Sequence, residues 1–123
     1  MTPLGARLRQ LRDARGLKLK DMAKALNVSS AYLSALEHGR RGTPTWALLQ
    51  RIITYFNIIW DEAEDLQRLA EISDPKVAID TAGLTPEATE LANRLAAGIA
   101  RLTPDDLQFL KNAVIKRARR RDG

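Results

Sequence analysis

The stretch "KDMAKALNVSSAYLSALEHG", residues 20–39, contains two short helical patterns joined by a connection of only three or four residues. The first pattern places three apolar residues on one face of a helix: Met22, Ala23 and Leu26. Asn27 can take the left-handed backbone conformation that ends a helix, and Val28 follows as a buried residue. The pattern therefore predicts a helix that ends at a tight turn.

The second pattern begins at Ser29, a residue type that is common at the N-cap of a helix. The helix is expected to continue to about Glu37, because Gly39, just beyond it, is typical of a helix end. The spacing therefore predicts a helix, a turn and a helix within these 20 residues.

The flanking segments predict three more helices around this pair. Leu4, Leu8 and Leu11 recur at helical spacing before Gly16, which ends the first helix. Thr45 is expected to cap a largely apolar helix that ends at Asn57. A further helix follows in residues 60–72, with an inner face formed by Trp60, Ala63, Leu66, Leu69 and Ala70.

The C-terminal part is predicted to form a helical hairpin. We divide the chain into a domain at residues 1–72, a linker at 73–84, extended or forming a very short strand, and a hairpin at 85–123. Thr85 and Thr103 are each followed by proline and an acidic residue, a pattern typical of a helix start. The apolar stripes of the two helices need cover from the N-terminal domain or from another copy.

The composition limits the class of protein. The chain has 123 residues, 45% of them hydrophobic, so it can bury one modest core. With no cysteine and one histidine it has neither a disulfide nor the side chains for a metal cluster. No apolar run approaches the roughly 20 residues that span a bilayer. We expect a soluble cytoplasmic protein with no metal, no cofactor and no membrane partner.

Positive charge is concentrated in the N-terminal half. Residues 1–57 contain ten Lys or Arg and three Asp or Glu, residues 58–75 contain one and six, and residues 76–123 contain nine and six. The last segment includes the cluster "KRARRR" at residues 116–121. This asymmetry favours an anionic partner, nucleic acid first and a membrane surface second, although a solvated surface would carry the same charges.

Residues 8–52, "LRQLRDARGLKLKDMAKALNVSSAYLSALEHGRRGTPTWALLQRI", resemble the helix-turn-helix domain of the lambda repressor and Cro-like (Xre) family of DNA-binding regulators. The resemblance extends over about residues 4–58 and rests on the leucine frame, the turn, Gly39 and a following P-x-x-x-L-L. It implies an all-α fold, a five-helix lambda-repressor-like domain here followed by the hairpin. It also implies a sequence-specific transcriptional regulator, repressor or activator, that binds double-stranded DNA as a homodimer.

The second helix of the motif would then be the recognition helix. At about 100° per residue, its small and polar residues lie on one side and Leu33 and Leu36 on the other. The resemblance places the base-contacting positions on the small face, at Ser30, Ala31, Ser34, Ala35 and His38. Hydroxyl and methyl groups discriminate bases less sharply than a bidentate arginine, so we expect limited sequence preference in each half-site. A small outer face could also arise by chance in a helix that only packs.

Contacts to the DNA backbone are expected from residues around this helix. Arg40 and Arg41 form an adjacent pair in the loop that follows it, and the other candidates are Lys18, Lys20, Tyr32 and Thr43. A solvated surface charge is the alternative for each lysine. Many members of the family have a small capping residue followed by glutamine where this chain has Lys18 and Leu19. Leucine cannot donate a hydrogen bond, so the usual phosphate contact and helix cap are not implied here.

The resemblance also implies a structural ion pair and the formation of a dimer. Arg12 and Glu37 occupy positions that form a structural ion pair in the family, so we expect a structural rather than a catalytic role. Because such regulators generally bind two half-sites as dimers, the hairpin is a candidate dimerisation segment. From the apolar stripes of the hairpin we expect an intra- or intermolecular helix interface at Leu91, Leu95, Ile99, Leu107, Leu110 and Val114.

Other functions would require other features in the C-terminal half of the chain. An antitoxin of a toxin–antitoxin pair would use the same helix-turn-helix on its own operon and the hairpin to bind a protein partner. An enzyme is not expected, because residues 59–123 contain no Cys, no His and no glycine-rich phosphate loop. The terminal basic cluster suits a solvated tail, a helix C-terminus or an extra phosphate contact. A DNA-binding regulator would lie in a bacterial cytoplasm, associated with the nucleoid when bound.

Overall fold

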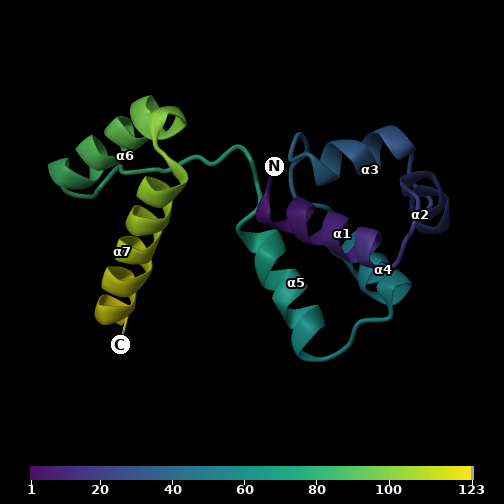
Figure 1. The fold of residues 1–123 in the computed structure, drawn as a ribbon. Coiled ribbons are helices and arrows are strands. Elements are labelled where there is room, and N and C mark those ends of the chain that lie inside the picture. Colours follow the sequence, from purple (N-terminus) through teal and green to yellow (C-terminus); the bar gives the residue numbers. More distant parts are fainter. Residues whose placement is uncertain (123) are drawn as a thin grey trace. The chain divides into compact units, whose positions relative to one another are not determined.

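The computed structural model describes residues 1–122, with side chains up to residue 120, and this part of the chain is helical without a strand (Figure 1). Gly123, the last residue of the predicted hairpin, and the side chain of Arg121 lie outside the described part. The elements are α1 (Pro3–Ala14), α2 (Leu19–Leu26), α3 (Ser30–Glu37), α4 (Trp46–Phe56), α5 (Asp61–Glu71), α6 (Pro86–Gly98), a short 3₁₀ helix (Ile99–Arg101) and α7 (Pro104–Asp122). The predicted all-α fold is confirmed, and the alternative of a short strand in residues 73–84 is wrong.

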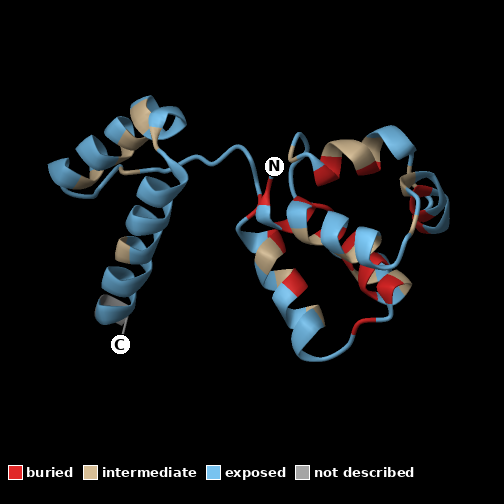
Figure 2. Cartoon of the chain, in the orientation of Figure 1, coloured by how far each residue is buried: buried red, intermediate tan, exposed pale blue. Residues whose placement is uncertain are grey.

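The chain folds into two compact units, one from Met1 to Val77 and one that begins at Ala78. In the first unit, α1 packs on α3 and α5, and α2 packs on α3 and α4. This packing buries a single apolar core to which all five helices contribute, and its residues are among the buried ones coloured red in Figure 2. Its fully buried side chains include Leu8, Met22, Leu33, Ile52 and Leu66. The core fixes the positions of α2 and α3 and leaves their outer faces free.

The connection between α2 and α3 is as tight as the sequence predicts. Asn27 has φ 59° and ends α2, and the amide of Val28 donates to the carbonyl of Ala23 at 3.0 Å. Val28 itself is half-buried against the core. The Ser29 hydroxyl accepts a hydrogen bond from the amide of Tyr32 at 3.0 Å, which caps α3. Two local features, a left-handed residue and a cap, therefore set where α3 starts.

Trp60 was expected on the inner face of α5, and this expectation is wrong. The residue precedes the helix with φ 55°, and 81% of it is exposed. The other four residues of the predicted face are buried or half-buried, with Leu66 at the centre. Helical spacing places Trp60 on the core side only if Trp60 is part of α5. Because α5 begins one residue later, at Asp61, that spacing does not apply to Trp60.

Ser73 belongs to the first unit, although it opens the predicted linker. It is buried, its hydroxyl accepts a hydrogen bond from the amide of Leu4 at 2.9 Å, and it donates to the carbonyl of Leu69. This side chain ties the start of α1 to the end of α5. Its position follows from tertiary packing, which no local pattern near Ser73 reveals.

The second unit has little core of its own. From residue 78 to residue 120 no side chain is buried, and the apolar residues of α6 and α7 remain open or half-buried. Thr103 caps α7 as predicted, since its hydroxyl accepts from the amide of Asp106 at 3.1 Å and the Asp106 carboxylate accepts from the amide of Thr103 at 3.0 Å. Thr85 does not cap α6. The backbone amide of Glu87 lowers the pKa of the Glu87 carboxylate, and the nearby Thr85 hydroxyl adds a smaller effect in the same direction.

None of the helices in the described part is long and apolar enough to cross a membrane.

Candidate nucleic-acid interface

Helix α3 presents a small outer face. Leu33, Leu36 and Glu37 are buried, so the helix is fixed by one side. Ser30, Ala31 and His38 are exposed, and Ser34 and Ala35 are half-buried on the same outer side. All five predicted base-contacting residues therefore lie on the solvent side of α3. Without long side chains, the helix backbone can come close to a surface that it contacts.

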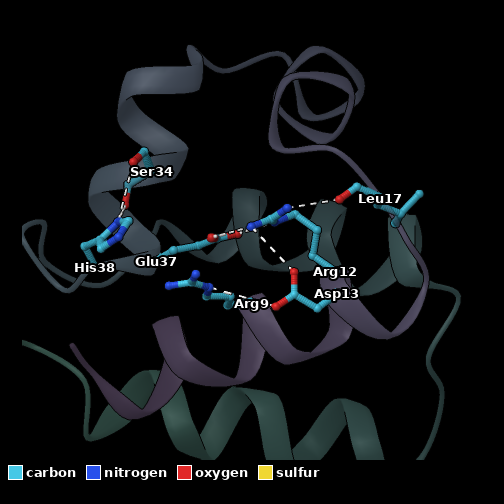
Figure 3. Close-up of polar contacts among 7 residues, drawn as sticks. All are labelled: Arg9, Arg12, Asp13, Leu17, Ser34, Glu37 and His38. Atoms are coloured by element: carbon cyan, nitrogen blue, oxygen red, sulfur yellow. Dashed lines mark hydrogen bonds and ion pairs between the residues drawn. The ribbon is translucent and has the colours of Figure 1, made fainter.

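An ion pair joins α3 to α1 at the inner edge of this face. The Arg12 Nε lies 2.9 Å from Glu37 Oε2, and the Arg12 Nη2 lies 3.2 Å from Oε1, so the pair is bidentate (Figure 3). The Arg12 Nη1 also donates to the carbonyl of Leu17 at 3.0 Å. The hydrogen bond to Glu37 raises the pKa of the Arg12 guanidinium, against a smaller opposing effect of burial. The only carboxylate of α3 is therefore neutralised inside the fold.

The loop after α3 carries the predicted arginine pair. Arg40 and Arg41 are exposed, and the Arg41 guanidinium lies over the ring of Tyr32, 5.7 Å from its centre. Tyr32 is half-buried and packs against the core, so its ring is held in place and the long Arg41 side chain can stack on it. The contact holds one positive charge of the loop close to the start of α3.

The N-terminus of the chain supports the same loop. Gly39 has φ 73°, and a Cβ atom there would lie 2.8 Å from the amide nitrogen of Thr2. The Thr2 hydroxyl in turn accepts from the amide of Gly5 at 3.0 Å and caps α1. Sequence reasoning identified Gly39 as a helix end but missed this close approach, because it joins segments 37 residues apart.

Helix α2 starts without the usual cap. Lys18 occupies the N-cap position and makes no capping hydrogen bond, and Leu19 is half-buried against the core. Lys18 and Lys20 are both exposed and are the charged groups available at this helix start. Where many family members have a capping residue and a glutamine, this chain therefore has the charge of Lys18 and the packing of Leu19.

One exposed aromatic residue near the loop escaped the sequence prediction. Trp46 is the first residue of α4 and is 65% exposed. Together with Thr43 and Leu49 it lines a shallow cleft of about 380 Å³ between the loop and α5. Helical spacing could not reveal this exposure, because Trp46 is in register with Leu49 and Ile53 on the apolar stripe of α4.

In the described part of the chain no three His, Cys, Asp or Glu side chains are placed to share an ion.

A basic loop beside a helix with a small outer face is suited to the DNA backbone and the major groove.

The bundle and its outer face define the class of DNA-binding helix-turn-helix proteins. Residues 3–66 match the family described as helix-turn-helix domain, slightly more than half of the chain. The chain belongs to this family.

Curated relatives carry the same description. The HTH-type transcriptional regulator DdrOP3 of Deinococcus deserti is 36% identical over 117 residues, which cover 94% of this chain and 84% of that protein. The uncharacterized HTH-type transcriptional regulator RghRB of Bacillus subtilis is 36% identical over 61 residues, 50% of this chain and 44% of that protein. The HTH-type transcriptional regulator RamB of Mycobacterium tuberculosis is 34% identical over 76 residues, 59% of this chain and 16% of that protein. All three names describe transcriptional regulators, and together with the helix-turn-helix domain they show that this chain is a DNA-binding transcriptional regulator.

Proposed function

We propose that this protein is an operator-binding regulator of the lambda repressor and Cro-like type that inserts α3 into the major groove of double-stranded DNA. The observation that carries the proposal is the outer face of α3, which is small, contains no Asp, Glu, Lys or Arg, and is bordered by Arg40 and Arg41. Base contacts come from Ser30, Ala31, Ser34, Ala35 and His38. Backbone contacts come from Lys18, Lys20, Tyr32, Arg40, Arg41 and Thr43. Such a protein acts in the cytoplasm, where the DNA lies.

Selection of binding sites from random duplex DNA tests this proposal. We expect two short half-sites about 34 Å apart, one helical turn, with modest preference inside each. Serine and alanine supply few hydrogen bonds, so spacing and DNA shape add to the specificity. Enrichment of a long motif with strong preference at every position would contradict this account of specificity, and the absence of any enriched duplex would contradict the function.

Arg41→Ala is expected to weaken binding by a similar factor on all sequences and to reduce the slope of log K against log salt by about 1, because a phosphate contact releases counterions. Tyr32→Leu keeps the charge and removes the aromatic support. It should weaken binding by a few-fold, the effect of about 0.5–1 kcal/mol, with little change of slope. Titrations at several salt concentrations measure both. Arg51→Ala removes an exposed arginine of α4 as a control, and an equal slope change there would refute the assignment to Arg41.

The open apolar faces of α6 and α7 support a dimer through the second unit. Leu95, Ile99, Leu107, Leu110 and Val114 line a groove of about 400 Å³ with almost no polar atoms, and Leu91 borders a neighbouring hollow. A helical pair of this size without buried side chains needs a partner to be stable. A second copy supplies an identical face and places two α3 helices on one DNA duplex.

Leu110→Asp is expected to convert a dimer into a monomer, because it places a charge in the groove without a partner for it. Affinity for a two-half-site operator should fall by at least about 100-fold, since the second half-site is no longer tethered. Sedimentation equilibrium and binding titrations measure the two effects. Gln108→Asp adds the same charge on α7 outside the groove and should leave the dimer intact. A wild-type protein that is monomeric at micromolar concentration would contradict the dimer.

The same groove supports the antitoxin alternative, in which a partner protein covers it. The two functions differ in the partner that the groove requires. A stable homodimer without a second protein favours the regulator, whereas a monomer that forms a defined complex with the product of an adjacent gene favours the antitoxin.

A further inference from the structure

His38 is held at the end of α3 by the backbone of its own helix. Its ring Nδ1 lies 2.8 Å from the carbonyl oxygen of Ser34, as Figure 3 shows. The same carbonyl accepts the backbone amide of His38 at 3.0 Å, so side chain and main chain bind one oxygen. The Ser34 hydroxyl lies farther away, at 3.5 Å from Nδ1. The carbonyl contact therefore sets the orientation of the ring.

This contact also determines which ring nitrogen carries the proton. A carbonyl oxygen can only accept, so Nδ1 must be the donor. In the neutral imidazole the other nitrogen, Nε2, then has a free lone pair and can only accept a hydrogen bond. In the imidazolium form Nε2 also carries a proton and becomes a donor. Because Nδ1 stays bonded in both forms, protonation reverses the hydrogen-bonding character of Nε2.

We propose that His38 is a specificity-determining residue whose preferred base changes with its protonation. The proposal rests on the proposed function, in which α3 lies in the major groove. As a neutral side chain, His38 accepts a hydrogen bond from the exocyclic amino group of adenine or cytosine. As a cation, it donates to N7 or O6 of guanine.

The surroundings of His38 leave Nε2 free for this role. The carboxylate of Glu37 is buried and held by Arg12, so it does not compete for the imidazole. The other charged groups of the segments around α3 are mostly basic: the Met1 amino group, Arg7, Arg9, Asp13 and Arg15 at α1, Lys18, Lys20, Asp21 and Lys24 at α2, and Arg40 and Arg41 in the loop. This basic setting brings the DNA close, and the DNA supplies the partner of Nε2.

The tautomer can be measured directly, because the chain contains a single histidine. Nitrogen-15 chemical shifts of the free protein above about pH 8 distinguish a protonated Nδ1 from a protonated Nε2. We expect the Nδ1–H form. A dominant Nε2–H form would overturn the proposal, since Nε2 would then donate at every pH. This measurement needs no DNA and is independent of the proposed function.

Binding-site selection at about pH 6 and about pH 8 measures the consequence. We expect one position in each half-site to change from adenine or cytosine at high pH to guanine at low pH, by on the order of threefold to tenfold, the effect of one hydrogen bond. The other positions should stay the same. His38→Gln, which has similar reach but does not titrate, should abolish the change.

The outcomes separate this proposal from the function on which it rests. An enriched motif that is identical at both pH values would overturn the role of His38 and leave the regulator intact. A pH-dependent base preference that persists in the His38→Gln protein would also overturn it. Failure to enrich any motif at either pH would contradict the proposed function itself.

Discussion

Glu37→Ala is expected to lower the free energy of unfolding by about 3–5 kcal/mol, the typical cost of breaking a buried ion pair. The Glu37 side chain is 2% exposed and that of Arg12 is 16% exposed, so little water can replace the lost carboxylate. Arg12 would keep its hydrogen bond to the carbonyl of Leu17 but would lose both bonds to Glu37. Urea denaturation measures the change, and a lower melting temperature should accompany it.

Two controls separate burial from charge in this result. The exposed pair of Glu90 and Arg94 on α6 has a similar separation of 2.7 Å, and Glu90→Ala should change stability little. The double change Arg12→Met and Glu37→Met leaves no unpaired charge and should recover part of the loss. If Glu37→Ala abolished DNA binding while the melting temperature stayed the same, the carboxylate would have a direct role in binding rather than a structural one.

The helices of the first unit were predictable because their ends are determined locally. Asn27 and Asn57 take the left-handed conformation with φ 59° and 53°, and Ser29 and Thr45 each accept a hydrogen bond from the amide three residues on. A residue type at a helix end needs only a few neighbours to have its effect. For these helix ends the sequence therefore contained the boundary as well as the apolar face.

Features that depend on distant segments were not predictable in the same way. Trp60 satisfies helical spacing yet lies outside the core, and Ser73 lies in a predicted linker yet bonds to the start of α1. The partner of Ser73 lies 69 residues away, so only the tertiary structure reveals that contact. Trp60 and Thr85 depend instead on local backbone conformation, since Trp60 has φ 55° and precedes α5, and the Thr85 side chain makes no capping hydrogen bond.

The candidate interface also combines features that the sequence predicts with features that it does not. The helical spacing of Leu33 and Leu36, with small residues on the opposite side of α3, was enough to predict which residues face outward. The stacking of Arg41 on Tyr32 and the bond from His38 to the Ser34 carbonyl depend on side-chain rotamers, which the sequence does not state. These contacts convert a set of exposed residues into groups with fixed directions, and they are the part of the site that required a structure.

Gly5→Ala is expected to destabilise the first unit by about 3 kcal/mol, the upper part of the range for overpacking a filled core. A methyl group at this position would lie 2.7 Å from the carbonyl oxygen of Leu36 and closer still to that of Glu37. Both obstacles are backbone atoms at the end of α3, so no side chain can rotate to make room. Helix α1 would have to move away from α3, which would strain the Arg12–Glu37 pair as well.

The same substitution should also weaken DNA binding by more than the loss of folded protein explains, because the displaced end of α3 carries His38 and precedes the arginine loop. Thermal unfolding and binding titrations below the melting temperature measure the two effects. For stability, Gly98→Ala is the matched control, since a methyl group there meets no atom within 4 Å apart from its chain neighbours and its own helix backbone. Alanine generally favours helix over glycine by about 0.5–1 kcal/mol, so this control should not destabilise the protein. Equal stability of the two variants would mean that α1 and α3 do not approach as closely at Gly5 as the packing requires.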